Sequence, residues 1–236
     1  MAEARSSPLR AALAWGVHLF TASGAVVGLC ALLAAAHGEP RRAGLLMLVA
    51  LTIDSLDGML ARAVRVSEVL PQVDGRRLDD LVDYLNYVIV PAVFLVETDL
   101  LPHWGFAALP VLASAYGFAH VQAKTDDDFF LGFPSYWNVL ALYCWLLELP
   151  PAANAALLAA LSPLVAVPFK YLYPSRMRAL RRTHHALAVI CIGLLAAAVA
   201  DPERGRALHL PLLSLAHPAF YLAVSFWQGG LRRRAP

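Results

Sequence analysis

Four aspartates lie in two stretches of sequence that are otherwise apolar enough to be buried. Asp54 and Asp57 are three residues apart, and Asp79 and Asp83 are four apart. On helices, each pair shares a face. An ionised side chain inside a membrane span costs roughly 2.5–3.5 kcal/mol on insertion scales, so these carboxylates need a partner or a function. Hard divalent cations take oxygen ligands, so the four aspartates predict a site for Mg²⁺ or Mn²⁺.

Small residues next to the first pair support a ligand site. Gly58 and Ala61 continue the helical stripe of Asp54 and Asp57, and they leave room for a ligand to approach the backbone. The competing explanation is that the acids simply form ion pairs with neighbouring arginines. That explanation leaves the stripe of small residues without a purpose. The arginines in question are Arg62, Arg65, Arg76 and Arg77.

The composition places these aspartates in a membrane protein. Of the 236 residues, 59% are hydrophobic and 15% are charged, and the mean hydropathy is +0.59. Soluble domains are typically about 45–50% apolar and about 25% charged. A net charge of +2 is too small to indicate nucleic-acid binding. We therefore expect an all-α integral membrane protein.

Apolar runs long enough for membrane helices recur along the whole chain. A bilayer core takes about 20 apolar residues as a helix. The runs predict about eight transmembrane helices in a single membrane domain over residues 1–236, with a catalytic core at about 12–170 and additional helices at about 171–236. The eight runs are roughly 12–36, 43–62, 78–97, 104–122, 135–149, 153–170, 185–200 and 208–228.

The basic residues predict the orientation of these helices. Lysine and arginine stay on the cytoplasmic side. With eight spans and both termini cytoplasmic, 15 of the 19 basic residues lie inside, and only Arg41, Arg42, Arg204 and Arg206 lie outside. In this topology the second helix runs inward and the third runs outward. Both aspartate pairs are then expected near the cytoplasmic ends of their helices, at a similar depth.

The order of these residues resembles the signature of a known family. Asp54-x-x-Asp57-Gly58-x-x-Ala61-Arg62, followed by Gly75-x-x-x-Asp79-x-x-x-Asp83, is similar to the signature of the CDP-alcohol phosphatidyltransferases. Here 12 residues separate Arg62 from Gly75, a longer gap than most of that family has. The gap resembles that of one branch, the bacterial phosphatidylcholine synthases. Two further blocks are also similar to this branch: His18-Leu-Phe-Thr21-Ala-Ser23-Gly24, and the segment from Lys124 to Asn138.

The resemblance implies a reaction, a cofactor and a location. In that family an alcohol attacks the β-phosphorus of CDP-diacylglycerol, which gives a phospholipid and CMP. It implies two metal ions per site, Mn²⁺ or possibly Mg²⁺, held by the four aspartates, with Asp83 as general base. The branch implies choline as the acceptor. It also implies a multi-pass protein of the bacterial inner membrane, a homodimer, and an active site that faces the cytoplasm.

The resemblance also assigns residues to the nucleotide lipid. For Arg62 both a phosphate contact and a structural counter-ion remain open. Lys124 either binds the lipid phosphate or balances Asp126, Asp127 and Asp128. The residues expected to bind CDP-diacylglycerol are Thr21, Ser23, Asp54, Gly58, Ala61, Arg62, Gly75 and Lys124.

The acceptor is expected to meet aromatic side chains. Choline is a permanent cation, and cations bind to aromatic faces. Tyr87 is favoured because it lies one turn beyond Asp83, although tyrosine and tryptophan near a membrane interface are commonly belt residues. The candidates are Tyr84, Tyr87, Tyr116, His120, Tyr136 and Trp137.

Two other functions remain as alternatives. Serine, glycerol-3-phosphate or inositol phosphate would replace choline within the same reaction class. A cation or proton transporter would belong to a different class, but it should have acidic residues throughout the bilayer and often inverted repeats.

Overall fold

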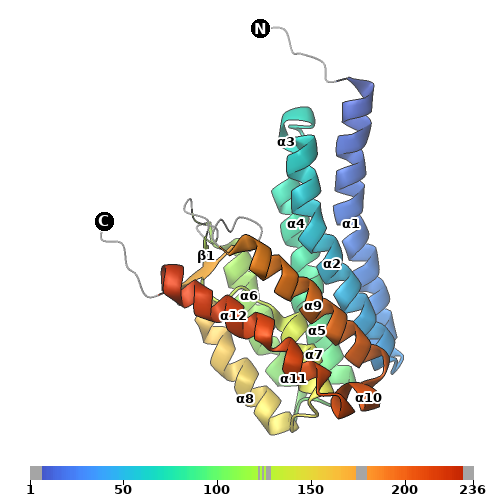
Figure 1. Ribbon diagram of the computed structural model, residues 1–236, viewed down its shortest axis with the longest axis vertical. Coiled ribbons are helices and arrows are strands. Elements are labelled where there is room, and N and C mark those ends of the chain that lie inside the picture. Colours follow the sequence, from blue (N-terminus) through green and yellow to red (C-terminus); the bar gives the residue numbers. More distant parts are fainter. Residues whose placement is uncertain (1–6, 122, 124, 126–128, 174–179, 231–236) are drawn as a thin grey trace.

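The computed structural model describes residues 7–121, 123, 125, 129–173 and 180–230. The chain folds almost entirely into helices (Figure 1). The α-helices are α1 (Pro8–Ala36), α2 (Pro40–Val64), α3 (Val66–Val69), α4 (Gly75–Tyr84), α5 (Val90–Glu97), α6 (Ala108–Ala119), α7 (Trp137–Leu146), α8 (Pro151–Leu161), α9 (Arg181–Ala200), α10 (Pro202–Ala207), α11 (Leu210–Ser214) and α12 (Ala216–Ser225). Two 3₁₀ segments (Trp104–Ala107, Ser162–Val165) and two π segments (Leu85–Ile89, Phe226–Gly230) continue these helices.

Helical segments occupy each of the eight predicted apolar runs. Within the described residues, four are long and apolar enough to cross a membrane, at 8–36, 40–64, 181–200 and 210–229. Shorter apolar helices cover 104–119, 137–146 and 151–165, and the predicted third run lies on the continuous helix from α4 to α5. This architecture agrees with a helical membrane protein. The number of spans and the side on which the termini lie remain predictions.

α1, α2 and α4 lie side by side and extend beyond the rest of the molecule (Figure 1). α1 begins at Pro8 after an N-cap at Ser7, whose hydroxyl accepts a hydrogen bond from the amide of Arg10. Gly28 allows α1 to pack closely against the π segment Leu85–Ile89, because a Cβ at position 28 would lie 2.5 Å from Oδ1 of Asn86. The Asn86 amide donates to the carbonyl of Gly24 at 3.0 Å. The packing of α1 is therefore fixed by a small residue and one buried amide.

The helix that carries Asp79 and Asp83 changes pitch after Tyr84. Residues Leu85–Ile89 form a π-turn, in which the amide of Val90 bonds to the carbonyl of Leu85. Pro91 explains this turn, because it has no amide hydrogen and its ring crowds the preceding turn. π-turns of this kind are frequent at functional sites. This one holds Tyr87.

The structure corrects the expected end of the sixth run. The helix there ends at Leu161 and continues as 3₁₀ only to Val165, whereas the prediction extended it to residue 170. Lys170–Leu172 instead forms strand β2, which pairs antiparallel with β1 (Phe129–Leu131). Across the described residues, the fold is therefore helical except for this short two-stranded sheet. Pro163 accounts for the early end, because it cannot donate a helical hydrogen bond.

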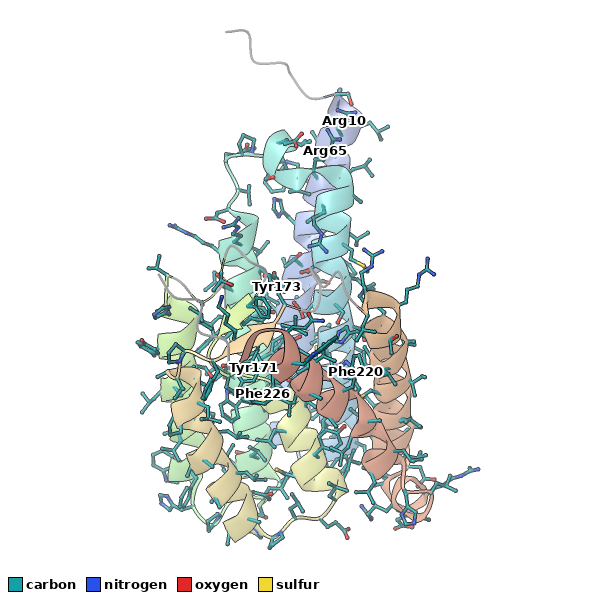
Figure 2. All side chains as sticks on the ribbon, turned by 60° about the vertical axis from the view of Figure 1, so that its left-hand side comes forward. Arg10, Arg65, Tyr171, Tyr173, Phe220 and Phe226 are labelled. Atoms are coloured by element: carbon teal, nitrogen blue, oxygen red, sulfur yellow. The ribbon has the colours of Figure 1, made fainter. Side chains whose placement is uncertain are left out.

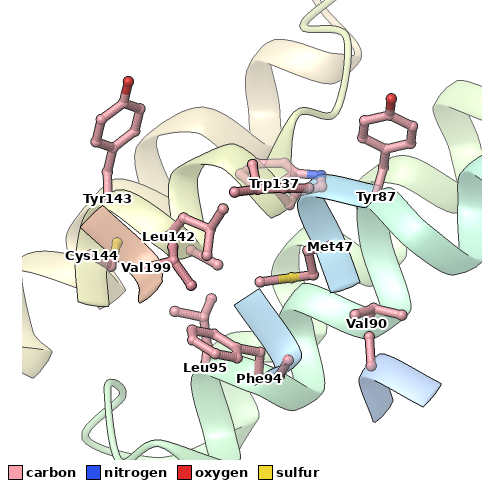
Figure 3. Packing of buried hydrophobic residues seen from close by; sticks show 14 of the residues in the cluster. Met47, Tyr87, Val90, Phe94, Leu95, Trp137, Leu142, Tyr143, Cys144 and Val199 are labelled. Atoms are coloured by element: carbon pink, nitrogen blue, oxygen red, sulfur yellow. The ribbon is translucent and has the colours of Figure 1, made fainter. Parts of the chain in front are cut away.

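The apolar core joins the aspartate-bearing helices to the C-terminal helices. Met47, Phe94, Trp137 and Leu142 are at most 2% exposed and pack together (Figure 3). Val199 of α9 reaches the same cluster. α9 thus packs on α2 and α7 and forms part of one core with them.

Candidate functional site

Three of the four predicted aspartates meet at one point. Asp54 and Asp57 project from α2, and Asp79 projects from α4. One carboxylate oxygen from each lies within 4.8 Å of the others, and Asp57 is 6% exposed. We call these residues the carboxylate trio.

The composition of the trio fits a divalent metal ion. Hard cations such as Mg²⁺ and Mn²⁺ prefer carboxylate oxygens, whereas three carboxylates this close repel one another without a counter-charge. The trio can therefore hold a metal ion. Asp83, the fourth predicted ligand, is not one of the three, and it interacts electrostatically with the hydroxyls of Tyr87 and Tyr136.

Three of the four arginines considered above as ion-pair partners of the aspartates divide into two groups. Arg65 pairs with Glu68 at 3.8 Å, and Arg77 pairs with Asp74 at 3.3 Å, so both have acidic partners outside the trio. Arg62 lies over Gly58, where a Cβ would be 3.2 Å from its Nη1, and its charge acts on Asp57. Of these three, Arg62 is the one whose charge acts on a member of the trio.

α1 provides one wall beside the trio. The Thr21 side chain interacts with the carboxylate of Asp57. Ser23 lies two residues further on, and its hydroxyl donates to the Phe20 carbonyl of its own helix at 2.6 Å. Of these two hydroxyl side chains, Thr21 is the one that interacts with the trio.

The small residues of the motif have different surroundings. Ala61 packs against the apolar cluster of α1 and α3 that includes Val17 and Leu70. Gly75 is the first residue of α4, and the ring of His18 lies against it. Asp74 caps this helix, since its side chain accepts hydrogen bonds from the amides of Arg76 and Arg77 at 3.1 and 3.3 Å.

Tyr87 connects the trio to a row of aromatic rings. Its hydroxyl donates to Oδ2 of Asp54 at 2.6 Å, and the side chain is 5% exposed. The ring of Tyr136 lies 6.0 Å away, and the ring of Tyr221 lies 6.1 Å beyond that, both edge to face. We call Tyr87, Tyr136 and Tyr221 the tyrosine row. Figure 3 shows Tyr87 at the edge of the apolar core.

Sequence reasoning missed the contribution of the C-terminal part of the chain. The hydroxyl of Tyr221 on α12 interacts with that of Tyr136 and donates a hydrogen bond to the Leu172 carbonyl at 3.0 Å. Tyr173 interacts with Tyr136, and its ring lies 4.4 Å from that of Phe130. No local pattern indicates these contacts, because they join segments far apart in sequence.

The other aromatic candidates lie elsewhere. The Tyr84 hydroxyl donates to the Val111 carbonyl of α6 at 3.1 Å. Trp137 is 1% exposed in the core and donates to the Ser114 hydroxyl at 2.8 Å. The rings of Tyr116 and His120 lie 5.6 Å apart with their planes tilted, and they line a pocket at the end of α6. Lys124 lies outside the described residues.

Comparisons with known proteins identify the family of the chain. The sequence profile of the CDP-alcohol phosphatidyltransferases matches residues 17–191, which include the trio, Asp83, Tyr87 and Tyr136. The phosphatidylcholine synthase of Pseudomonas aeruginosa is 37% identical over 226 residues, 94% of each chain. That of Legionella pneumophila is 38% identical over 91% of this chain and 88% of its own, and that of Legionella bozemanae is 40% identical over 78% and 88%. The chain belongs to the CDP-alcohol phosphatidyltransferase family.

Proposed function

We propose that the protein transfers the phosphatidyl group of CDP-diacylglycerol to choline, which yields phosphatidylcholine and CMP. A new bond forms between the choline oxygen and the β-phosphorus, and the bond from that phosphorus to the CMP oxygen breaks. The observation that carries the choice of acceptor is the contact between Tyr87 and Asp54. This hydrogen bond places the first ring of the tyrosine row beside the carboxylates that would bind the metal ions at the reacting diphosphate. The name of the relatives supports the same acceptor.

The tyrosine row is suited to a quaternary ammonium group. Aromatic faces attract cations, and the attraction strengthens where water is excluded. Tyr87 and Tyr221 are 5% and 7% exposed. Their burial argues against a role in an interfacial belt. Tyr84, Tyr116, His120 and Trp137 are less suited, because the contacts above tie them to α6 or to the core.

Asp83 is the proposed general base. It lies one turn after Asp79 on the same helix and interacts with two members of the tyrosine row. A choline held by these rings would present its hydroxyl to this carboxylate. Asp83 would accept the hydroxyl proton as the oxygen attacks.

The nucleotide end of the substrate is assigned to the side of the trio opposite the tyrosine row. Asp54, Asp57, Asp79 and Asp83 would hold two Mn²⁺ ions, or Mg²⁺ in their place, and these ions would supply positive charge to the diphosphate and the departing CMP. Thr21, Gly58, Ala61, Arg62 and Gly75 would line the nucleotide side. The Arg62 guanidinium would offset phosphate charge. Ser23 and Lys124 remain assigned by resemblance.

The proposed location is the bacterial cytoplasmic membrane, with eight spans, cytoplasmic termini and the trio on the cytoplasmic side. Arg10 and Arg65 lie at the far end of the long helices (Figure 2), as expected for a cytoplasmic end rich in basic residues. From the family resemblance, the proposal includes a homodimer.

The test uses purified protein, labelled CDP-diacylglycerol and Mn²⁺. Choline, serine, glycerol-3-phosphate and inositol phosphate are offered separately. Phosphatidylcholine formed with choline alone, and abolished by a chelator, is the expected result. A product from another alcohol would retain the reaction class and overturn the acceptor. No product with any acceptor would overturn the proposed function.

A further inference from the structure

His18 is a buried histidine of α1 that has no role in the chemistry proposed above. The side chain is 6% exposed. Its Nε2 atom is buried and has no hydrogen-bond partner in the part of the chain that the structure describes. A buried polar atom without a partner is destabilising, and each such atom in a native protein needs an explanation.

The position of His18 suggests a ligand as that explanation. Its ring lies against Gly75 at the start of α4, where a Cβ would be 3.2 Å from Cε1 of the imidazole. Thr21 is three residues further along α1 and therefore shares this face of the helix. The Thr21 side chain in turn interacts with the Asp57 carboxylate of the trio. His18 thus lies one helical turn from a residue that touches the proposed metal site.

We propose that Nε2 of His18 hydrogen-bonds the cytidine portion of the nucleotide lipid. This assignment rests on the proposed function, which places the diphosphate at the trio and the acyl chains in the bilayer. Cytidine must then extend from the trio toward the cytoplasm. His18 lies on that side, because it is closer than Thr21 to the N-terminus of α1. The ribose and the base offer both donors and acceptors, so either tautomer of the imidazole makes the bond.

The competing explanation is a buried water molecule bonded to Nε2. A water molecule with a purely structural role would leave nucleotide affinity independent of this nitrogen. The two explanations therefore differ in the affinity of the protein for CMP. CMP is a suitable probe because it contains the cytidine portion and needs neither the acceptor nor the lipid tails.

The experiment measures CMP binding to the purified full-length protein in detergent with Mn²⁺, by calorimetry and by the CMP-dependent rise in Tm. His18→Leu removes the nitrogen, whereas His18→Gln places a polar atom close to the position of Nε2. We expect His18→Leu to weaken CMP binding about 3–10-fold and His18→Gln to retain most of it. The KM for CDP-diacylglycerol should rise in His18→Leu, and the KM for choline should not.

The matched control is His184→Leu on α9. His184 is 4% exposed, and its buried Nδ1 also has no partner within the described ranges. This variant should leave CMP affinity unchanged. The assignment would be overturned if His18→Leu bound CMP as tightly as wild type. It would also be overturned if His18→Gln and His184→Leu lost as much CMP affinity as His18→Leu. If His18→Leu does not fold, wild-type affinity in both His18→Gln and His18→Ala would overturn it. If the activity test shows that another alcohol is the acceptor, this CMP-binding test still applies. If the wild-type protein does not bind CMP, both this assignment and the proposed function are overturned.

Discussion

The hydroxyl of Tyr87 donates a 2.6 Å hydrogen bond to Oδ2 of Asp54. This contact joins a residue of the π-turn to a carboxylate of α2, 33 residues earlier in the chain. The side chain of Tyr87 therefore has two separable roles, one for the hydroxyl and one for the ring. The hydroxyl positions a carboxylate of the trio, and the ring begins the row of aromatic faces.

Substitutions at Tyr87 should separate these two roles. Tyr87→Phe keeps the ring and loses a hydrogen bond to a charged group, which is worth about 1.5–3 kcal/mol. We expect a fall of about tenfold or more in kcat with little change in the KM for choline. Tyr87→Ala also loses the ring, so it should raise the KM for choline far more than the KM for CDP-diacylglycerol. Steady-state kinetics with each substrate varied in turn measures both effects.

Equal increases in both Michaelis constants for Tyr87→Ala would indicate general packing damage. Tyr84→Ala on the same helix is the control. It removes a ring whose hydroxyl bonds to α6, so it should not raise the KM for choline selectively.

Asp83→Asn should nearly abolish turnover while CDP-diacylglycerol still binds. An amide cannot accept the choline proton, and loss of a general base typically costs about 10²–10⁴ in rate. Turnover and the binding of labelled CDP-diacylglycerol are measured on the same preparation. Near-normal turnover would remove Asp83 from the role of base.

Metal binding should be visible in stability as well as in activity. Adding Mn²⁺ to chelator-treated protein should raise its Tm, because a ligand that binds only the folded state stabilises it, by about 2.7 kcal/mol at 100 times Kd. Asp57→Asn should lose most of this rise. Without metal it should be at least as stable as wild type, since one repelling charge has been removed.

Asp80→Asn is the control for the metal experiment. Asp80 is on α4 next to Asp79 but is not part of the trio. This variant should keep the Mn²⁺-dependent rise in Tm. Equal rises in wild type and Asp57→Asn would contradict a metal site at the trio.

The packing of α1 makes a prediction about stability alone. Gly28→Ala places a Cβ 2.5 Å from Oδ1 of Asn86, which must shift and weaken its bond to Gly24. The variant should lose about 1–3 kcal/mol of stability. Gly16→Ala on the same helix has open space around the new Cβ, so helix propensity should leave it neutral or slightly more stable. Thermal unfolding in one detergent compares the two, and a Gly28→Ala variant as stable as Gly16→Ala would contradict the close packing.

The sequence predicts that Asp54, Asp57, Asp79 and Asp83 come together, because each aspartate pair is local, and the structure groups three of the four. A spacing of three or four residues defines a helix face, and two such faces on consecutive helices meet when the helices pack. The tyrosine row and the short sheet arise differently. Tyr136 and Tyr221 come from separate segments, and Phe129 pairs with Leu172 across the chain, so no local spacing indicates either contact. Pro91 was a usable signal for the π-turn before it.

The role of α12 can be tested at Tyr221, where the ring and the hydroxyl again have different effects. Tyr221→Leu removes an aromatic face that lies 6.1 Å from Tyr136, so we expect the KM for choline to rise about 5–30-fold, the equivalent of about 1–2 kcal/mol of cation–π attraction. Tyr221→Phe keeps that face and should stay within about twofold of wild type. Phe226→Leu is the control on the same helical segment, because its ring contacts Tyr171 rather than Tyr136. An unchanged KM for choline in Tyr221→Leu would limit the acceptor site to Tyr87 and Tyr136, and the C-terminal helices would then serve packing alone.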